Sequence, residues 1–203
     1  MVVVGSHGHN IAAEILLGGV ASAVLHHASL PVLIIRLKAP GKDGAGVCNG
    51  TACDFGSHVL FPTDFSDNAE RAFGWVQGIV ASGVKRVALM HVQDKAKIEK
   101  YLKDRPEDFN KIDFDDEISA INKERLERLK AKLKDQGEAD IQIELLYGSP
   151  TEQILKYIQE NTVSLVIMGS QGRGFIKEIF LGSVSHNVAR HAAASTLLIP
   201  ALR

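Results

Sequence analysis

Short apolar runs alternate with segments of helical periodicity from residue 57 onward. The run at residues 163–168 (VSLVIM) is apolar at nearly every position, which is typical of a strand buried on both faces. The apolar runs predict strands at residues 58–62, 86–92, 140–147, 163–168 and 196–199. The segments between them predict helices over residues 67–82, from the capping box Ser149–Glu152 onward, and over residues 183–193. Strands that alternate with helices predict an α/β fold with a doubly wound parallel sheet.

Residues 94–138 depart from this pattern because charged residues of both signs dominate them. They hold 12 Lys and Arg and 13 Asp and Glu. Apolar residues recur at helical spacing only in the second half, at Ile118, Ile121, Leu126, Leu129 and Leu133. This pattern predicts a long solvated helix with one packed stripe, and the mixed signs favour exposure over a nucleic-acid patch. We expect residues 95–115 to be irregular and mobile.

The first part of the chain repeats the last part. Residues 1–36 align with residues 165–200 without a gap, and 14 of the 36 positions are identical. Glycines coincide in this alignment, as at Gly18 and Gly182. A repeat of this kind indicates two related strand-helix-strand units. The predicted domains are residues 1–37 as the C-terminal portion of one unit, a glycine-rich linker at 38–56, and a complete domain at 57–203.

Composition and charge narrow the function classes. Lys plus Arg total 23 and Asp plus Glu total 24, so a net charge of -1 lacks the electrostatic footprint of a nucleic-acid binder. No apolar run approaches the roughly 20 residues that span a bilayer, and the first residues lack the basic segment of a signal peptide. Cys48 and Cys53, both in the linker, are expected to be unpaired. We therefore expect a cytoplasmic protein that binds neither nucleic acid nor membrane.

A glycine-rich loop follows the most apolar strand. Residues 169–174 (GSQGRG) form this loop, and residues 182–185 (GSVS) begin the next predicted helix, so that nine residues separate Gly172 from Gly182. Glycine lets the backbone approach a ligand without a Cβ in the way. The unpaired N–H groups at a helix start favour an anion. Hydroxyl groups at Ser183 and Ser185 add hydrogen-bond donors, so the segment predicts a phosphate site.

The predicted first strand ends at the same edge of the sheet, because ligands of open parallel sheets lie beyond the carboxyl ends of the strands. Asp64 there could orient a ribose or adenine donor, or help to hold a metal ion. Arg173 could contact the phosphates or be a solvated loop residue, and the glycines could simply make turns. His91 is expected to pack or to bond the backbone. No Walker A loop, dinucleotide GxGxxG or Ser-His-Asp arrangement is present in the sequence.

These residues resemble the motifs of the universal stress protein family. The resemblance is carried by residues 59–66 (VLFPTDFS), His91-Val92, residues 168–172 (MGSQG) and residues 182–184 (GSV). It covers essentially all of residues 57–203, and residues 1–36 resemble the last portion of another such domain. The resemblance implies a five-stranded parallel sheet in the order 3-2-1-4-5, with an extra N-terminal strand-helix-strand fragment.

The resemblance also implies ATP, with Mg²⁺ as its companion, held between the first and fourth strands. The implied nucleotide-binding residues are Pro62, Thr63, Asp64, Val92, Met168, Gly169, Gln171, Gly172, Arg173, Gly182, Ser183, Val184 and Ser185. Gln171 departs from the His that ATP-binding members often carry, and the first copy has His7 at that position. Gly19 replaces the Ser in the first copy, and no strand there supplies an Asp. We therefore expect no independent nucleotide site in the first copy.

The expected function is ATP binding by a stress-response regulator, with an unidentified regulatory protein as a further partner. No residue is predicted to be catalytic or to bind a metal ion directly. The alternatives are a slow ATP-dependent hydrolase or transferase on the same site, and a nucleotide-free dimerisation module. Because family domains tend to pair through their last strands, residues 31–36 (PVLIIR) are expected to pair with residues 196–199 or with a second chain. A homodimer paired through last strands is therefore expected.

Overall fold

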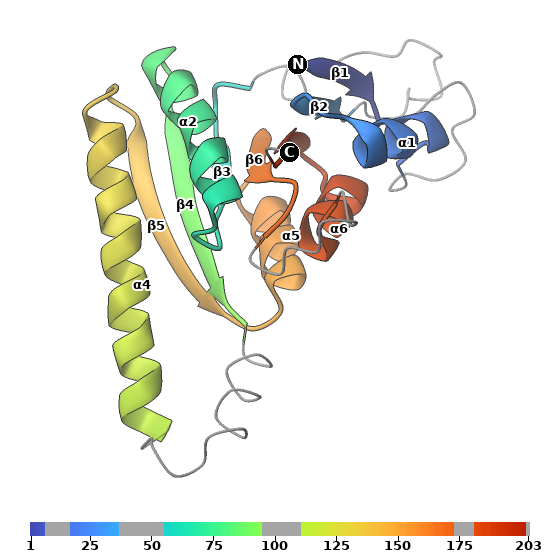
Figure 1. Cartoon of the computed structure of the whole chain (residues 1–203). Helices are drawn as coiled ribbons and strands as arrows, with labels where there is room; N and C mark the ends of the chain where they lie inside the picture. Colours follow the sequence, from blue (N-terminus) through green and yellow to red (C-terminus); the bar gives the residue numbers. More distant parts are fainter. Residues whose placement is uncertain (7–16, 37–54, 95–110, 173–180, 202–203) are drawn as a thin grey trace.

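The computed structural model describes residues 1–6, 17–36, 55–94, 111–172 and 181–201 (Figure 1). The described strands are β1 Val2–Gly5, β2 Val32–Ile35, β3 Val59–Pro62, β4 Arg86–Gln93, β5 Asp140–Tyr147, β6 Leu165–Gly169 and β7 Ser195–Ile199. The described helices are α1 Gly19–His27, α2 Asp67–Ala81, α4 Lys111–Lys134, α5 Pro150–Glu160 and α6 Ser183–His191. All seven strands form one sheet, so this is the α/β fold that the sequence predicts.

The strand order of the sheet is β1-β2-β7-β6-β3-β4-β5. From β3 to β7 every pair is parallel, and the order β5-β4-β3-β6-β7 is third, second, first, fourth and fifth along the chain. This is the expected order. The direction of winding reverses between β3 and β6, where a doubly wound sheet leaves a crevice for a ligand.

The N-terminal unit joins the sheet through its last strand. β2 pairs antiparallel with β7, with Leu33 opposite Leu197, and β1 pairs parallel with β2. The expected pairing of the two last strands is therefore made within one chain. Both edges of β2 and of β7 are occupied, so a homodimer would need another surface and stays a prediction. The division of the chain into two domains and a linker also stays a prediction, and Cys48 and Cys53 lie outside the described residues.

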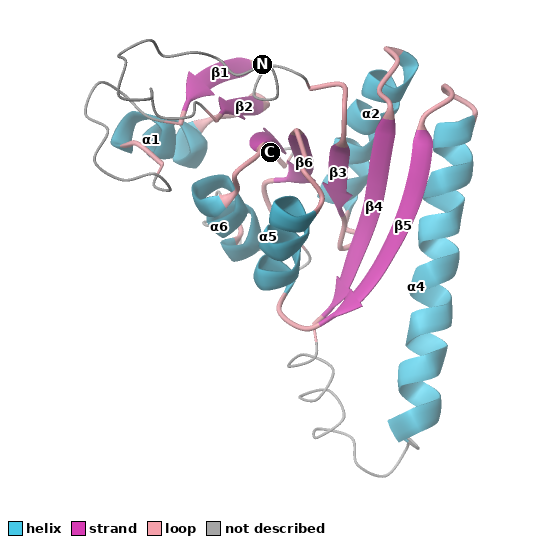
Figure 2. Cartoon of the chain, turned by 180° about the vertical axis from the view of Figure 1, so that it is seen from behind, coloured by secondary structure: helices cyan, strands magenta, loops and turns pink. Residues whose placement is uncertain are grey.

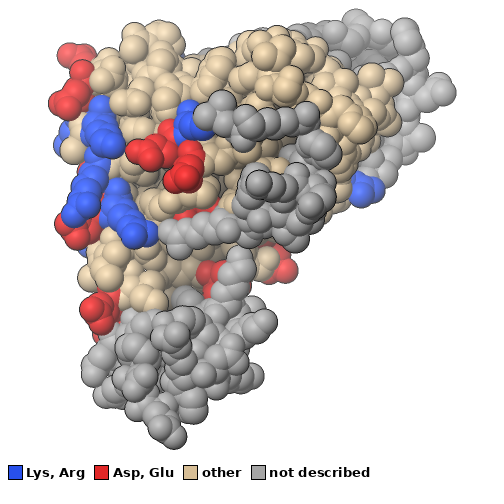
Figure 3. Space-filling view, viewed as in Figure 1, with Lys and Arg blue, Asp and Glu red and all other residues tan. Residues whose placement is uncertain are grey.

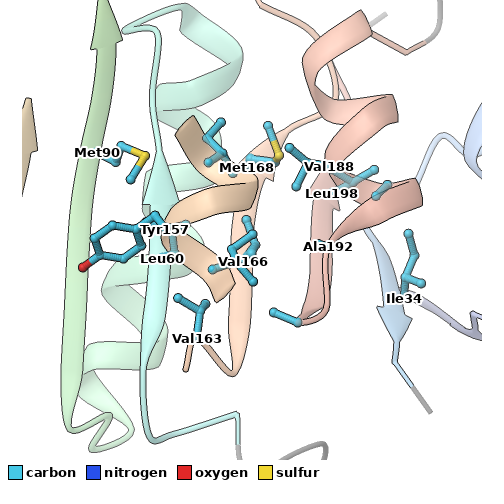
Figure 4. Close-up of a cluster of buried hydrophobic side chains, with 14 of the residues drawn as sticks. Ile34, Leu60, Met90, Tyr157, Val163, Val166, Met168, Val188, Ala192 and Leu198 are labelled. Atoms are coloured by element: carbon cyan, nitrogen blue, oxygen red, sulfur yellow. The ribbon is translucent and has the colours of Figure 1, made fainter. Parts of the chain in front are cut away.

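Helices cover both faces of the sheet (Figure 2). One buried cluster joins residues of α1, α5 and α6 to the strands, and Figure 4 shows Ile34 of β2 in this cluster with Leu60 and Leu198. The other cluster joins α2 and α4 to the opposite face. Its members include Phe73 and Leu126, which are almost fully buried. The core therefore lies in two layers, and the N-terminal unit contributes to the first of them.

Two expectations about the charged region are corrected. α4 begins at Lys111, so residues 111–115 are helical and not irregular, while residues 95–110 lie outside the described residues. Leu126 and Leu133 are fully buried and Leu129 packs against the core, but Ile121 is 44% exposed. The solvated face of α4 carries interleaved charges (Figure 3). The packed stripe is therefore real but narrower than expected.

The helix starts follow different chemistry at α2 and α5. Ser66 is the N-cap of α2, and its side chain accepts a hydrogen bond from the Ala69 N–H at 3.2 Å. α5 begins at Pro150, as expected, but the Ser149 side chain makes no capping hydrogen bond. The predicted capping box is therefore wrong in its contacts. The fixed φ of proline, suited to the first helical position, still accounts for the start of the helix.

Candidate functional site

A cavity of about 470 Å³ opens at the carboxyl ends of β3, β4 and β6. The start of α6 and the first turn of α5 complete it, together with α4. The predicted binding residues that line it are Pro62, Thr63, Asp64, Val92, Met168, Gly169, Gln171, Gly172, Gly182, Ser183, Val184 and Ser185. Arg173 lies outside the described residues. The structure therefore brings together every predicted binding residue that it describes.

Gly169, the last residue of β6, and Gly172, in the loop that follows, lie close to side chains of the protein itself. A Cβ on Gly169 would lie 2.8 Å from Asn68 Nδ2, and a Cβ on Gly172 would lie 2.5 Å from Asp64 Oδ2. Real Cβ atoms do not approach other atoms so closely. Glycine is therefore needed here for the approach of the loop to α2 and to Asp64, in addition to any ligand. The expectation from sequence considered only turns and the ligand.

Asn68 anchors the loop and was missed by sequence reasoning. It lies in the first turn of α2, is 7% exposed, and donates from Nδ2 to the carbonyl oxygen of Gln171 at 3.1 Å. A hydrogen bond to a buried amide fixes the loop that follows β6 relative to α2. No signal in the sequence distinguishes Asn68, because polar residues are common in the first turn of any helix.

The turn after β3 is held by local hydrogen bonds. Asp64 Oδ1 accepts from the Ser66 N–H at 3.1 Å, and Thr63 Oγ1 accepts from the Phe65 N–H at 3.0 Å. His91 Nδ1 lies 2.7 Å from the Thr63 carbonyl oxygen, and the His91 and Phe65 rings are 4.6 Å apart. The expected backbone hydrogen bond of His91 is confirmed. These contacts hold Asp64 in place at the wall of the cavity.

The start of α6 supplies backbone donors on the opposite wall. The first helical hydrogen bond runs from the His186 N–H to the Gly182 carbonyl oxygen at 2.9 Å. The N–H groups of Ser183, Val184 and Ser185 therefore precede the helical bonding pattern, and they carry the positive end of the helix dipole. This arrangement favours an anion at the cavity wall.

The Ser185 hydroxyl does not point to a ligand. Ser185 is 3% exposed, and its Oγ donates to the carbonyl oxygen of Ser170, at 2.6 Å, with the Gly182 carbonyl oxygen 2.9 Å away. The same Ser170 carbonyl oxygen accepts the Gly182 N–H at 2.7 Å. The expectation of a Ser185 side-chain donor is corrected: this hydroxyl fastens α6 to the loop. Ser185 could therefore contact an anion only through its backbone N–H.

The other end of the cavity is lined by residues that sequence reasoning missed. Gln93 is 3% exposed, and its Oε1 accepts a hydrogen bond from Ser119 Oγ at 3.3 Å. Ser119 also bonds the Tyr147 hydroxyl. Among the residues that the structure describes, Gln93 Nε2 has no hydrogen-bond partner. Because Gln93 lines the cavity and buried amide groups are usually hydrogen-bonded, Nε2 is a candidate donor to a ligand with an acceptor atom.

Ile118 and Asn122 of α4 line the same end of the cavity. Asn122 is 8% exposed and lies four residues from Ile118 and four from Leu126. A polar residue at the centre of an apolar stripe was the available signal for this side chain. The apolar stripe alone predicts packing, and it gives Asn122 no role at a cavity.

The charged groups on the described cavity wall are Asp64 and Asp94. No group of three or more His, Cys, Asp or Glu within the described ranges is placed to hold a metal ion. The buried groups with shifted pKa values lie away from the cavity. Burial lowers the pKa of the His58 imidazole, and burial together with the charge of Glu144 raises the pKa of Tyr157.

Comparison with known proteins agrees with this architecture. The sequence model of the universal stress protein family matches residues 1–36 and 57–200 of this chain. The chain belongs to this family. Universal stress protein MJ0577 of Methanocaldococcus jannaschii is 32% identical over 152 residues, which cover 70% of this chain and 93% of that protein.

Two solved structures extend the likeness to the fold. The structure of MJ0577 has a TM-score of 0.64 and 29% identity, and covers 73% of this chain and 99% of that chain. A universal stress protein structure from Archaeoglobus fulgidus covers 97% of this chain and 61% of that chain, with a TM-score of 0.59. Its identity of 21% supports the fold alone. In this universal stress protein, no helix among the described residues is long and apolar enough to cross a membrane.

Proposed function

We propose that this universal stress protein binds ATP in the cavity between β3 and β6 and acts as a regulator of the stress response. The observation that carries the proposal is the convergence of the described candidate residues on one cavity of about 470 Å³. This volume lies within the range of about 300–1,000 Å³ that is usual for small-molecule and cofactor sites. The cavity also lies at the reversal of strand order, where doubly wound sheets bind nucleotides.

The two ends of the cavity suit the two ends of a nucleotide. Thr63, Asp64 and Val92 would face the adenosine, and the buried Gln93 amide would offer a donor to it. The phosphate chain would lie between Gly172 and the N–H groups at the start of α6. Because no Lys or Arg is among the described residues of the wall, we propose that Mg²⁺ accompanies the phosphates and balances their charge.

We propose regulation rather than turnover. Phosphoryl transfer needs a group that orients the nucleophile and a cation that stabilises the transition state. Among the described residues of the wall the charged groups are Asp64 and Asp94, so no Lys or Arg there would assist Mg²⁺ in stabilising the transition state. Asn68 and Ser185 hold residues 170–172 beside the cavity, and we propose that a bound nucleotide alters the surface that a partner protein recognises there. The cytoplasmic location and the regulatory protein partner also remain proposals.

The experiment is to denature freshly purified protein by heat and identify any released nucleotide by chromatography and mass spectrometry. Calorimetric titration with Mg-ATP, ADP and AMP then ranks the three ligands for the wild type, for Asp64→Ala and for Asp140→Ala. Asp140 is a matched control, because it is an exposed carboxylate at the start of β5, at the opposite edge of the sheet. We expect a weakening of about tenfold or more for Asp64→Ala and no change for Asp140→Ala, since tenfold corresponds to about 1.4 kcal/mol.

Two results would reject the proposal. The first is the absence of both released nucleotide and affinity at millimolar adenine nucleotide, which would favour the nucleotide-free alternative. The second is steady turnover of ATP with a small acceptor that Asp64→Ala abolishes, which would favour the transferase.

A further inference from the structure

β1 is an edge strand with one side unpaired within the described sheet. It pairs with β2 only, at the end of the strand order (Figure 1). The Val2 N–H donates to the Pro31 carbonyl oxygen at 2.7 Å, and the Ser6 N–H donates to the Ile35 carbonyl oxygen at 2.9 Å. Backbone groups alternate in direction along a strand, so the N–H and C=O of Val3 face away from β2. An edge of this kind can accept a further strand.

The side chains of this edge leave one apolar face exposed. Met1 is 58% exposed and Val3 is 52% exposed. On the opposite face, Val2 and Val4 pack against the buried cluster that contains Leu25 of α1. Val3 pairs with Leu33 and Leu33 with Leu197, so the three side chains lie on the same face of the sheet. Leu197 is 3% exposed and lies in the buried cluster to which α2 contributes, whereas this face loses its cover toward β1.

The internal repeat shows how the same face is covered in the complete copy. Met1 and Val3 correspond to Leu165 and Ile167 in the repeat. Leu165 is 3% exposed and Ile167 is fully buried. The corresponding face is therefore buried in β6 and exposed in β1.

Two neighbouring elements make this difference. β3 pairs parallel with β6, with Val59 opposite Leu165. α2 then packs Phe73 and Val76 into the same cluster as Leu165 and Ile167. Neither element has an equivalent beside β1 among the described residues. Figure 2 shows α2 beside β3 and β4, at a distance from β1.

We propose that β1 and the exposed face at Met1 and Val3 bind a strand-helix unit of another polypeptide. The strand would add in parallel beside β1, and the following helix would cover Val3 with an apolar face of the kind that α2 presents. Backbone hydrogen bonds would supply affinity, as in other cases of strand addition, and the helix would supply selectivity. The inference concerns a surface away from the nucleotide cavity and does not depend on nucleotide binding.

A second copy of this chain fits the surface less well. β3 of a folded copy already has β4 and β6 on its two sides, so it cannot add to β1 without unfolding. Antiparallel pairing of two β1 strands would satisfy the backbone edge, but it would bring no helix over Val3. The occupant that satisfies both the edge and the apolar face is therefore a strand followed by a helix.

The test uses the full chain and a fluorescently labelled peptide with the sequence of residues 57–82 as the probe. Fluorescence anisotropy would follow binding to the wild type and to two variants. We expect saturable one-to-one binding to the wild type and a weakening of about tenfold or more for Val3→Lys, where tenfold corresponds to about 1.4 kcal/mol. Val20→Lys is the matched control, since Val20 is 79% exposed on α1 and α1 packs on the other face. It should leave the affinity unchanged.

A second variant tests the backbone edge separately. Val3→Pro removes the outward N–H and keeps an apolar side chain, while the hydrogen bonds of Val2 and Ser6 to β2 remain. Val3→Pro should also weaken binding of the peptide. The proposal is overturned if the wild type does not bind the peptide, or if Val3→Lys and Val20→Lys bind alike. It is also overturned if sedimentation shows a dimer that Val3→Lys dissociates, because a second copy would then occupy the edge.

Discussion

At Gly172 the space that a side chain would need is taken by Asp64. The same is true of Gly169, where Asn68 lies against the backbone. These contacts couple Gly169 and Gly172 to Asn68 and Asp64, which lie about a hundred positions earlier in the sequence. A change at one of these four residues is therefore expected to shift the wall of the proposed nucleotide cavity. The spacing of the glycines gives no hint of this coupling.

Gly172→Ala is expected to displace the Asp64 carboxylate, since the new Cβ would lie 2.5 Å from Oδ2. We expect nucleotide affinity to fall by about tenfold or more, which is about 1.4 kcal/mol, measured by calorimetric titration. Gly78→Ala is the control, because a Cβ at Gly78 meets nothing within 4 Å and the residue lies inside α2. It should keep the affinity and raise the free energy of unfolding by about 0.5–1 kcal/mol. Equal affinity in both variants would contradict this coupling.

His58 should make stability depend on pH. It is 4% exposed, its Nδ1 lies 2.9 Å from the Asn161 carbonyl oxygen, and its Nε2 has no partner among the described residues. Burial lowers the pKa of the imidazole, and Arg86 adds to this effect while the Asn161 hydrogen bond and Asp140 oppose it. The unfolded chain therefore binds the proton more readily. The contribution is present above a pH of about 6.5 and is lost as the pH falls toward the lowered pKa.

The measurement is the urea midpoint of unfolding between neutral and mildly acid pH. We expect the midpoint of the wild type to fall more steeply with acidification than that of His58→Gln, which cannot titrate. His27→Gln replaces an exposed histidine of α1 and should keep the slope of the wild type. Equal slopes for the wild type and His58→Gln would show that His58 is protonated alike in the folded and unfolded chains.

The bounds of helices and strands are predicted closely by the sequence where the element has one or two apolar faces. β5 has the predicted bounds Asp140–Tyr147, and α2 ends one residue before its predicted end at residue 82. The predictions are wrong where tertiary packing determines whether a side chain is buried or hydrogen-bonded. Ile121 fits the helical stripe of α4 but is exposed, and Ser149 fits a capping box but makes no capping hydrogen bond. Both errors arise because a local sequence pattern does not specify which tertiary contacts or side-chain hydrogen bonds a residue makes.

The candidate site shows the same limit. Residues next to strand ends, such as Asp64 and Gly169, were found because the fold places all strand ends at one edge. Gln93 lies one residue beyond its predicted strand, and Asn122 lies on a helix far along the chain. Their place at the cavity depends on how α4 crosses the sheet, which helical periodicity does not specify.

β2 should contribute measurably to the stability of the sheet formed by β3 to β7. Ile34 is fully buried, and it shares a cluster with Leu60 and Leu198. Ile34→Ala is expected to lower the free energy of unfolding by about 2–5 kcal/mol, as for other buried large-to-small changes. Urea unfolding followed by the fluorescence of Trp75 in α2 would measure this effect at a distance from the substitution. Val20→Ala, at an exposed position, should change stability by no more than about 0.5 kcal/mol.

At the scale of the whole molecule, the strands of both copies of the repeat lie in one sheet. The antiparallel pairing of β2 with β7 lets the strand-helix-strand unit extend a sheet that is otherwise parallel. Arg36 strengthens this junction: it is 8% exposed, and its Nη2 donates to the Ala189 carbonyl oxygen of α6 at 2.6 Å. The backbone N–H of the same residue donates to Ser195 Oγ at 3.2 Å. Burial of this guanidinium lowers its pKa, and such a group is tolerated where it has hydrogen-bond partners.

One sheet and one shared cluster predict one cooperative unfolding transition, although the sequence predicts two units joined by a linker. Leu25 and Val32 of the N-terminal unit lie in the same buried cluster as Leu60 and Val166. If that cluster forms as a whole, the amides of β2 and of β6 should exchange hydrogen with the same global free energy. Native-state hydrogen exchange at increasing urea, read by mass spectrometry, would measure both strands in one sample. Exchange of β2 at a clearly lower urea concentration than β6 would show instead that the N-terminal unit opens independently.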